Sequence, residues 1–235
     1  MQAPTEDAFR ALAHSSPWLF TTLHLTVRRP LRSPVEAWLS RPGRLAVEVD
    51  GARHVVTGVP YGKAVLRGAG TEPEPWVASP PQDHTPRWRA DGLVGRRPGR
   101  LEVDYDDPLW GSYEWVAMLD PVELSAGTRL RDLQATARAG RETWWALAVG
   151  VEGYDPRYSC CPLLWGAESE RLYAGADAGP LRAADEYPEW LVGLDRATGV
   201  VVSCEPVGPV GVPAGFTVDL YEVDVDLPDA LFAPR

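Results

Sequence analysis

Hydrophobic and polar residues alternate along several segments of this chain, and a period of two is typical of β-strands with one buried face. The clearest case is the segment 44–50, in which Leu45, Val47 and Val49 share one face. Asp50-Gly51 comes next and predicts a two-residue hairpin turn into another strand. The same reasoning predicts strands at residues 18–28, 44–50, 53–58, 129–137, 142–152, 190–195, 200–205 and 216–226.

Helical spacing is limited to two parts of the chain. Near the N-terminus, Thr5 can cap a helix whose residues Phe9 and Leu12 face the core. Ser15-Ser16-Pro17 is expected to end this helix, because proline disfavours the helical conformation of the residue before it.

The second expected helix begins at Pro108, because the first helical position needs no N–H donor. Asp107 would cap it, and residues 120–124 would form a further short turn capped by Asp120. The apolar stripe of this helix would comprise Leu109, Trp110, Tyr113, Val116 and Ala117.

The connections between the expected strands are short, which favours antiparallel neighbours. Residues 59–100 are rich in Pro, Gly and Trp and predict a long loop, with short strands near 61–66 and 101–105. No β-α-β alternation and no internal boundary are visible. We therefore expect one α+β domain over residues 1–235, dominated by an antiparallel sheet.

Charge and segment composition narrow the classes of function. The net charge of −10 disfavours nucleic acid and anionic membrane surfaces as partners. No apolar run approaches the roughly 20 residues of a membrane-spanning helix, and the N-terminus lacks the apolar region of a signal peptide, so a soluble, cytoplasmic protein is expected. Cys160, Cys161 and Cys204 do not form a disulfide framework and are expected as buried, reduced thiols, with Cys204 near the other two.

Ten tryptophans are spread along the whole chain. Two interpretations remain open for them. They can be large core residues, because tryptophan buries a large apolar area. They can also form the wall of a ligand cavity, because such cavities are lined by aromatic side chains.

Residues for catalysis or metal binding are sparse. The four histidines are scattered, and no zinc, phosphate-loop or hydrolase motif is present, so no metal and no cofactor are expected. Two acidic groups, 104–107 and 224–226, are the candidates for a carboxylate pair or a cation site. Asp224 and Asp226 would share the solvated face of a strand, so a structural role is favoured.

Local motifs resemble one known family. A Trp-x-x-Arg-Pro motif formed by Trp38, Arg41 and Pro42 leads into the strand 44–50, and a hairpin at 192–201 precedes Val-Asp-Val-Asp-Leu-Pro-Asp-Ala-Leu-Phe at 223–232. These motifs, with an N-terminal helix and a mid-chain helix between strands, resemble LolA-like lipoprotein carriers. Members of that family are exported, whereas this chain shows no signal peptide.

The resemblance implies a strongly curved antiparallel sheet, an open half-barrel whose concave face is plugged by helices and takes acyl chains. In that family an arginine matching Arg41 holds the lid helix shut, so Arg41 would bond backbone carbonyls near the helices at 108–124. The implied function is non-enzymatic binding of a hydrophobic small molecule or acyl chain, without catalytic residues. The expected ligand-binding residues are Trp38, Arg41, Trp110, Tyr113, Trp115 and Trp145.

Two other functions stay open from the sequence alone. The same fold can serve as an interaction or regulatory module that meets an unidentified cytosolic protein through the acidic surface and the loop at 67–100. An enzyme built on the acidic groups would need two carboxyl groups close together in a cleft, with at least one strongly shifted pKa.

Overall fold

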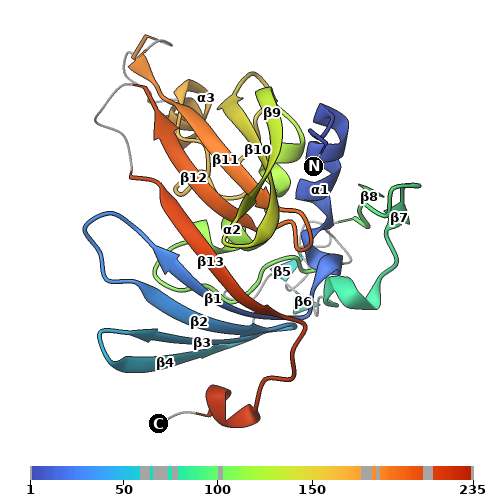
Figure 1. Cartoon of the computed structure of the whole chain (residues 1–235), viewed down its shortest axis with the longest axis vertical. Helices are drawn as coiled ribbons and strands as arrows, with labels where there is room; N and C mark the ends of the chain where they lie inside the picture. Colours follow the sequence, from blue (N-terminus) through green and yellow to red (C-terminus); the bar gives the residue numbers. More distant parts are fainter. Residues whose placement is uncertain are drawn as a thin grey trace.

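The chain folds around one large antiparallel sheet, seen in a computed structural model that describes residues 2–58, 64–65, 74–75, 79–99, 103–175, 182–183, 186–208 and 214–233. The strands of this sheet are β1 (Thr22–Arg28), β2 (Val35–Ser40), β3 (Arg44–Val49), β4 (Ala52–Thr57), β9 (Thr128–Arg138), β10 (Arg141–Gly150), β11 (Glu189–Asp195), β12 (Val201–Val207) and β13 (Phe216–Val223). Their order is β4-β3-β2-β1-β13-β12-β11-β10-β9 (Figure 1). The sheet is open, since β4 and β9 lie at its two ends.

The remaining elements are short. The helices are α1 (Glu6–Leu19), α2 (Glu114–Leu119) and α3 (Ala167–Ala174), with 3-10 turns η1 (Pro81–Asp83), η2 (Val122–Ser125) and η5 (Asp229–Phe232). Two small sheets pair β5 (Ala64–Val65) with β6 (Glu74–Pro75) and β7 (Arg87–Trp88) with β8 (Val94–Arg96). Within the described residues, no helix combines the length and the apolar character needed to cross a bilayer.

Most of the expected strands are confirmed, including all five after residue 127. The hairpin at Asp50-Gly51 is confirmed as well, because both residues have positive φ (51° and 78°), as a type I′ turn requires. The sequence pattern missed β2 as a strand of its own, so Trp38 lies inside a strand and not ahead of one. The short helix α3 was also missed, because Ser169 is its only buried residue and it shows no apolar stripe.

The prediction that α1 ends at Ser15-Ser16-Pro17 is wrong. The helix runs through Pro17 to Leu19, and β1 consequently begins at Thr22 instead of Trp18. Proline cannot donate to the carbonyl four residues earlier, which is that of Ala13. Arg97 supplies donors instead, from Nη2 to Ala13 O at 3.4 Å and from Nε to His14 O at 2.9 Å.

The second helix begins later than predicted. α2 starts at Glu114 and not at Pro108, because Gly111 has a φ of 76°, which no α-helix accommodates. Asp107 does not cap a helix, since its carboxylate pairs with Arg41. The turn expected at 120–124 is present as η2, which begins at Val122.

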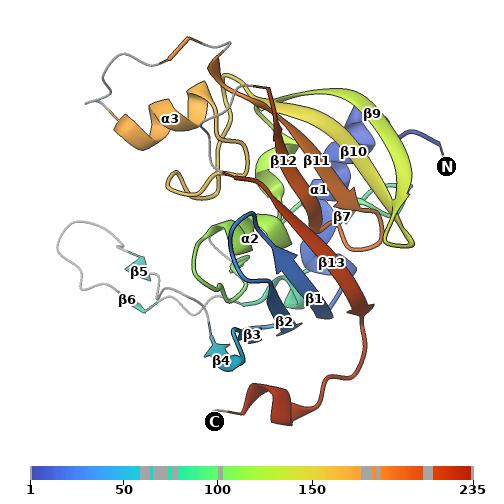
Figure 2. The same ribbon diagram turned by 60° about the vertical axis from the view of Figure 1, so that its left-hand side comes forward.

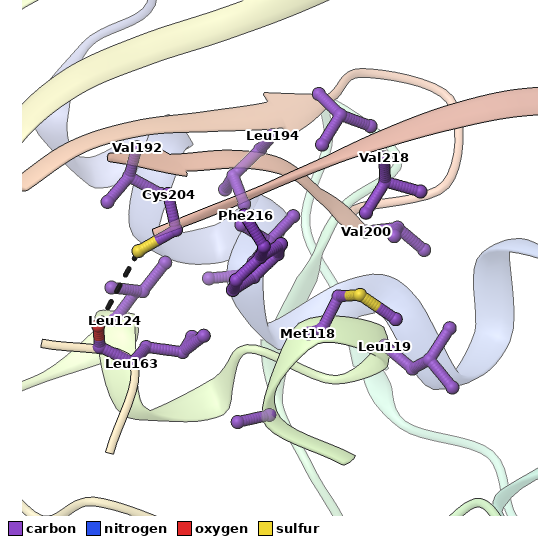
Figure 3. Packing of buried hydrophobic residues seen from close by; sticks show 14 of the residues in the cluster. Met118, Leu119, Leu124, Leu163, Val192, Leu194, Val200, Cys204, Phe216 and Val218 are labelled. Atoms are coloured by element: carbon purple, nitrogen blue, oxygen red, sulfur yellow. Dashed lines mark hydrogen bonds between the residues drawn. The ribbon is translucent and has the colours of Figure 1, made fainter. Parts of the chain in front are cut away.

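The main core lies between one face of the sheet and the helical segments α1, α2 and η2 (Figure 2). In the part of this core shown in Figure 3, sheet residues meet apolar residues of α2, η2 and the segment around Leu163. The sheet contributes Val192, Leu194, Cys204, Phe216 and Val218, and the facing segments contribute Met118, Leu119, Leu124 and Leu163.

The opposite face of the sheet carries a smaller apolar cluster. Ala46 of β3 packs there with Leu227 and Phe232 from the C-terminal segment, and Trp38 lies against this cluster. The C-terminal turn η5 therefore covers the outer face of β2 and β3.

The long loop expected at 59–100 lies partly outside the described residues. The expected strand at 61–66 is described only at β5, and residues 100–102 of the strand expected at 101–105 are likewise outside. In the described part, Val103 forms an isolated parallel bridge with Ser79. The stretch 79–99 packs on α1 through η1 and β8.

Candidate functional site

A cavity of about 690 Å³ lies where the β1–β2 turn, α2, the segment 160–165 and strands β12 and β13 meet. Its walls are rich in aromatic side chains, and its volume is in the usual range for small-molecule sites. Four tryptophans from three parts of the chain line it: Trp110 and Trp115 at α2, Trp165 in the segment 160–165 and Trp190 in β11.

The tryptophans differ in depth and in how they are held. Trp115 and Trp190 are buried, with exposed fractions of 1% and 3%. The indole N–H of Trp190 donates to the carbonyl oxygen of Trp165 at 2.9 Å, so this buried polar group is satisfied within the protein. Trp110 packs on the ring of His54 with the ring centroids 4.6 Å apart.

All three cysteines of the chain also line this cavity. Cys204 is buried, and its Sγ lies 3.5 Å from the carbonyl oxygen of Leu163 (Figure 3). Burial raises the pKa of the Cys204 thiol well above its usual value, and burial together with Cys160 raises that of Cys161 to about 11. The expectation of three buried thiols is wrong for Cys160, which is exposed, and for Cys161, which is only partly buried.

An ion pair stands beside the cavity at the β1–β2 turn. Arg29 Nε donates to Glu114 Oε2 at 2.9 Å, and Arg29 Nη2 contacts the same oxygen. The Arg29 guanidinium also lies 5.7 Å from the ring centroid of Phe216. Since Glu114 opens α2, this pair joins the turn to the helix across the cavity.

Arg41 lies at the C-terminal end of α1 and does not line this cavity. Its guanidinium binds the Asp107 carboxylate, with Nη2 to Oδ2 at 2.7 Å and Nε to Oδ1 at 2.9 Å. It also donates to the carbonyl oxygens of Ser16 and Phe20 at 2.8 and 3.4 Å. The expected carbonyl partners at 108–124 are therefore wrong; Arg41 closes the C-terminal end of α1, where helix carbonyls lack partners.

The acidic residues near Asp107 belong to a buried ionic cluster. Asp120 bonds Arg97 and Arg157, and Arg157 bonds Asp106 at 2.6 Å. Burial opposes the ionisation of Asp120, but the two guanidiniums hold its pKa at about 2. Tyr158 donates its hydroxyl to Asp106 Oδ2 at 2.6 Å, so the carboxylates of this cluster are already committed to partners.

Glu123 connects this cluster to the cavity wall. Its carboxylate accepts from the backbone N–H of Leu163 at 2.9 Å and of Arg157 at 3.2 Å. Burial raises the pKa of the Glu123 carboxyl to about 7, against the lowering effect of these hydrogen bonds. Glu123 thus holds the segment 157–163, which carries the two neighbouring cysteines.

The structure brings together only part of the site expected from the sequence. Trp110 and Trp115 line the cavity, whereas Tyr113 points away to stack with Tyr158, with the ring centroids 4.0 Å apart. Trp38 stacks on His24 on the outer face, with the centroids 4.9 Å apart.

Trp145 does not face the main core. Trp144, Ala146 and Ala148 of β10 are buried in that core, which places Trp145 on the opposite face. There its indole N–H donates to Thr136 at 2.9 Å and its ring covers Gly193, where a Cβ would lie 2.8 Å from the ring. The alternation of the strand was correct, but Trp145 was assigned to the wrong side of the sheet.

Two lining tryptophans were missed by the sequence reasoning. Trp190 alternates with Val192 and Leu194 on the core face of β11, so the period-two pattern contained its signal. Trp165 follows a Cys-Cys-Pro-Leu-Leu segment without regular structure and carries no such signal.

Within the described part of the chain, no group of three or more His, Cys, Asp or Glu side chains is arranged to hold a metal ion. Of the acidic residues singled out in the sequence, Asp224 accepts from the backbone N–H of Thr21 at 2.6 Å. This contact fixes the chain between α1 and β1.

No protein-family model and no curated protein matches the sequence. Solved structures to which the chain is similar include MucB, with 14% identity and a TM-score of 0.36, covering 96% of this chain and 61% of MucB. LprF from Mycobacterium bovis is 10% identical with a TM-score of 0.36 and 97% coverage of both chains. The LolA superfamily protein NE2245 from Nitrosomonas europaea is 10% identical with a TM-score of 0.25 and 99% coverage of both chains. A LolA superfamily protein is therefore among the solved structures to which the chain is similar.

Proposed function

We propose that this protein binds a hydrophobic small molecule or an acyl chain, without catalysis, in the cavity between the β1–β2 turn, α2 and β13. In this proposal the open sheet acts as a half-barrel, and α2 covers its concave face. The observation that carries the proposal is the meeting of four tryptophans from three segments around one cavity of about 690 Å³.

The placement of the polar groups supports binding over acid–base chemistry. Asp106 and Asp107, two of the carboxylates that the sequence offered for catalysis, are bonded to Arg157 and Arg41. The thiols of Cys161 and Cys204 have raised pKa values, as given above, and are therefore poor nucleophiles at neutral pH. An apolar ligand needs none of these groups to ionise.

Quenching of tryptophan fluorescence by a brominated fatty alcohol tests the proposal, because bromine quenches only rings that it approaches closely. We expect saturable quenching by the alcohol. We expect its amplitude to fall in Trp110→Phe and Trp165→Phe, which remove cavity rings.

Trp88→Phe and Trp145→Phe are the matched controls, since Trp88 is exposed and Trp145 lies on the outer face. Equal loss of quenching in all four variants would indicate nonspecific adsorption. Absence of saturable quenching in the unmodified protein would exclude an alcohol-sized apolar ligand.

A further inference from the structure

Two charged side chains at this cavity have no partner among the described residues. Arg32 lies in the turn between β1 and β2, Asp50 lies in the turn between β3 and β4, and both line the cavity. Neither side chain forms a hydrogen bond or an ion pair with any residue that the structure describes.

The pairing of β2 with β3 brings the two turns that carry these charges to the same end of neighbouring strands. Strands β2 and β3 pair in antiparallel register, with Glu36 opposite Glu48. The start of β2, next to Arg32, therefore lies beside the end of β3, next to Asp50. Both turns lie at this end of the strands, and residues of both turns line the cavity.

The neighbouring charges are neutralised within the protein. Arg28 pairs with Asp219 at 3.2 Å, and Arg29 pairs with Glu114. Arg32 and Asp50 are consequently the charges of the cavity lining that remain available to a bound molecule.

We propose that the cavity takes a single-chain amphiphile with a zwitterionic headgroup. The chain lies among the tryptophans, the anionic group of the head lies against Arg32, and the cationic group lies against Asp50. The inference rests on the proposed function, because it assigns the headgroup of a ligand whose chain occupies that cavity.

Electrostatics favours this headgroup over the simpler ones. A purely anionic head gains from Arg32 but is repelled by Asp50, and a purely cationic head meets the reverse. A head that carries both charges satisfies both residues. Arg32 and Asp50 are both exposed, so the expected preference over a singly charged head of the same chain is about threefold in Kd.

The test compares brominated amphiphiles of one chain length that carry a phosphocholine, sulfate, trimethylammonium or sugar head, each below its micelle concentration. Tryptophan quenching gives the Kd of each. We expect the phosphocholine compound to bind most tightly to the unmodified protein.

Charge removal should redirect the preference. Arg32→Gln should weaken phosphocholine binding and favour the trimethylammonium compound, whereas Asp50→Asn should favour the sulfate. Arg87→Gln and Asp132→Asn, which lie outside the cavity, should leave the ranking unchanged. Equal unfolding midpoints for all four variants will show that each is folded.

The outcomes separate the two proposals. Equal binding of all heads with no effect of Arg32→Gln or Asp50→Asn overturns the headgroup assignment and leaves the apolar cavity standing. Tightest binding of the sulfate or the trimethylammonium compound also overturns the assignment. Binding of none of the compounds overturns both proposals.

Discussion

Arg41 and Arg29 hold helical segments to the sheet by the same chemistry at two different places. Each binds a carboxylate through two nitrogens and lies over a phenylalanine ring, at 3.8 Å for Arg41 and 5.7 Å for Arg29. The Arg41 side chain is 4% exposed and also binds two carbonyls, whereas that of Arg29 is 15% exposed and its partner Glu114 is 24% exposed.

The surroundings of the two arginines differ in the same sense. Around Arg41, buried carboxylates and guanidiniums satisfy one another, which is the arrangement of a structural cluster. Around Arg29, aromatic and aliphatic side chains line a cavity, and Arg32 and Asp50 have no partner among the residues that the structure describes. The comparison teaches that the ionisable residues most conspicuous in the sequence serve the fold, and that the proposed ligand site lies where apolar surface is left open.

The largest effect is expected from Asp120→Asn. Asp120 is 1% exposed and is the shared partner of Arg97 and Arg157. Loss of its charge leaves two buried guanidiniums without a counterion and should lower the free energy of unfolding by about 3–5 kcal/mol. Urea denaturation followed by circular dichroism measures this loss.

Asp132→Asn is the matched control, because Asp132 and its partner Arg131 are exposed. Its effect on the free energy of unfolding should be small, since exposed ion pairs contribute little. Equal decreases in the free energy of unfolding of the two variants would show that the buried cluster contributes no more to stability than an exposed ion pair.

The next effect concerns Glu123, between the cluster and the cavity. Burial raises its pKa from 4.5 to about 7, so the folded protein binds this proton more tightly than the unfolded chain. Glu123 therefore adds to the free energy of unfolding below pH 4.5, and this contribution is lost as the pH rises to about 7. The loss should be about 3 kcal/mol.

Glu123→Gln removes this titration. The difference in the free energy of unfolding between the unmodified protein and the variant should therefore fall as the pH is raised through this interval. Glu152→Gln, at an exposed position, should show no such dependence. A pH-independent difference for Glu123→Gln would mean that the carboxyl stays ionised in the folded state.

The smallest effects are expected when Arg41 and Arg29 are each replaced by lysine. Lysine keeps the charge but cannot bind a carboxylate through two parallel bonds. Arg41→Lys should cost about 2 kcal/mol because it also leaves carbonyls unbonded, and Arg29→Lys should cost below about 1 kcal/mol. Urea denaturation of both variants measures the two changes in the free energy of unfolding. A larger decrease for Arg29→Lys than for Arg41→Lys would contradict the comparison.

The sequence predicted the sheet well where alternation was uninterrupted. Buried and more exposed residues alternate over the first four positions of β9 and the first five of β13. It failed at Pro17, because the donor that lets α1 continue is Arg97, far away in the sequence. A contact of this kind leaves no local pattern.

The site was harder to predict than the fold. Alternation correctly separated Trp144 from Trp145, but only the packed sheet shows which of them faces the core. Trp110 and Trp115 were expected at the site because they lie on the mid-chain helix that was expected to act as a lid. Trp165 lies in an irregular segment, and its position depends on tertiary contacts that the pattern does not encode.

Strand β13 is last in sequence among the nine strands, yet it lies between β1 and β12. Once every earlier strand has been synthesised, the nascent chain can form the β1–β4 meander and the β9–β12 meander. It still lacks the strand that pairs them into one sheet. Pairing of β1 with β13 brings together Leu23 and Val223, a contact of long sequence separation that slows folding. During synthesis the two meanders therefore remain separate sheets until the final strand arrives.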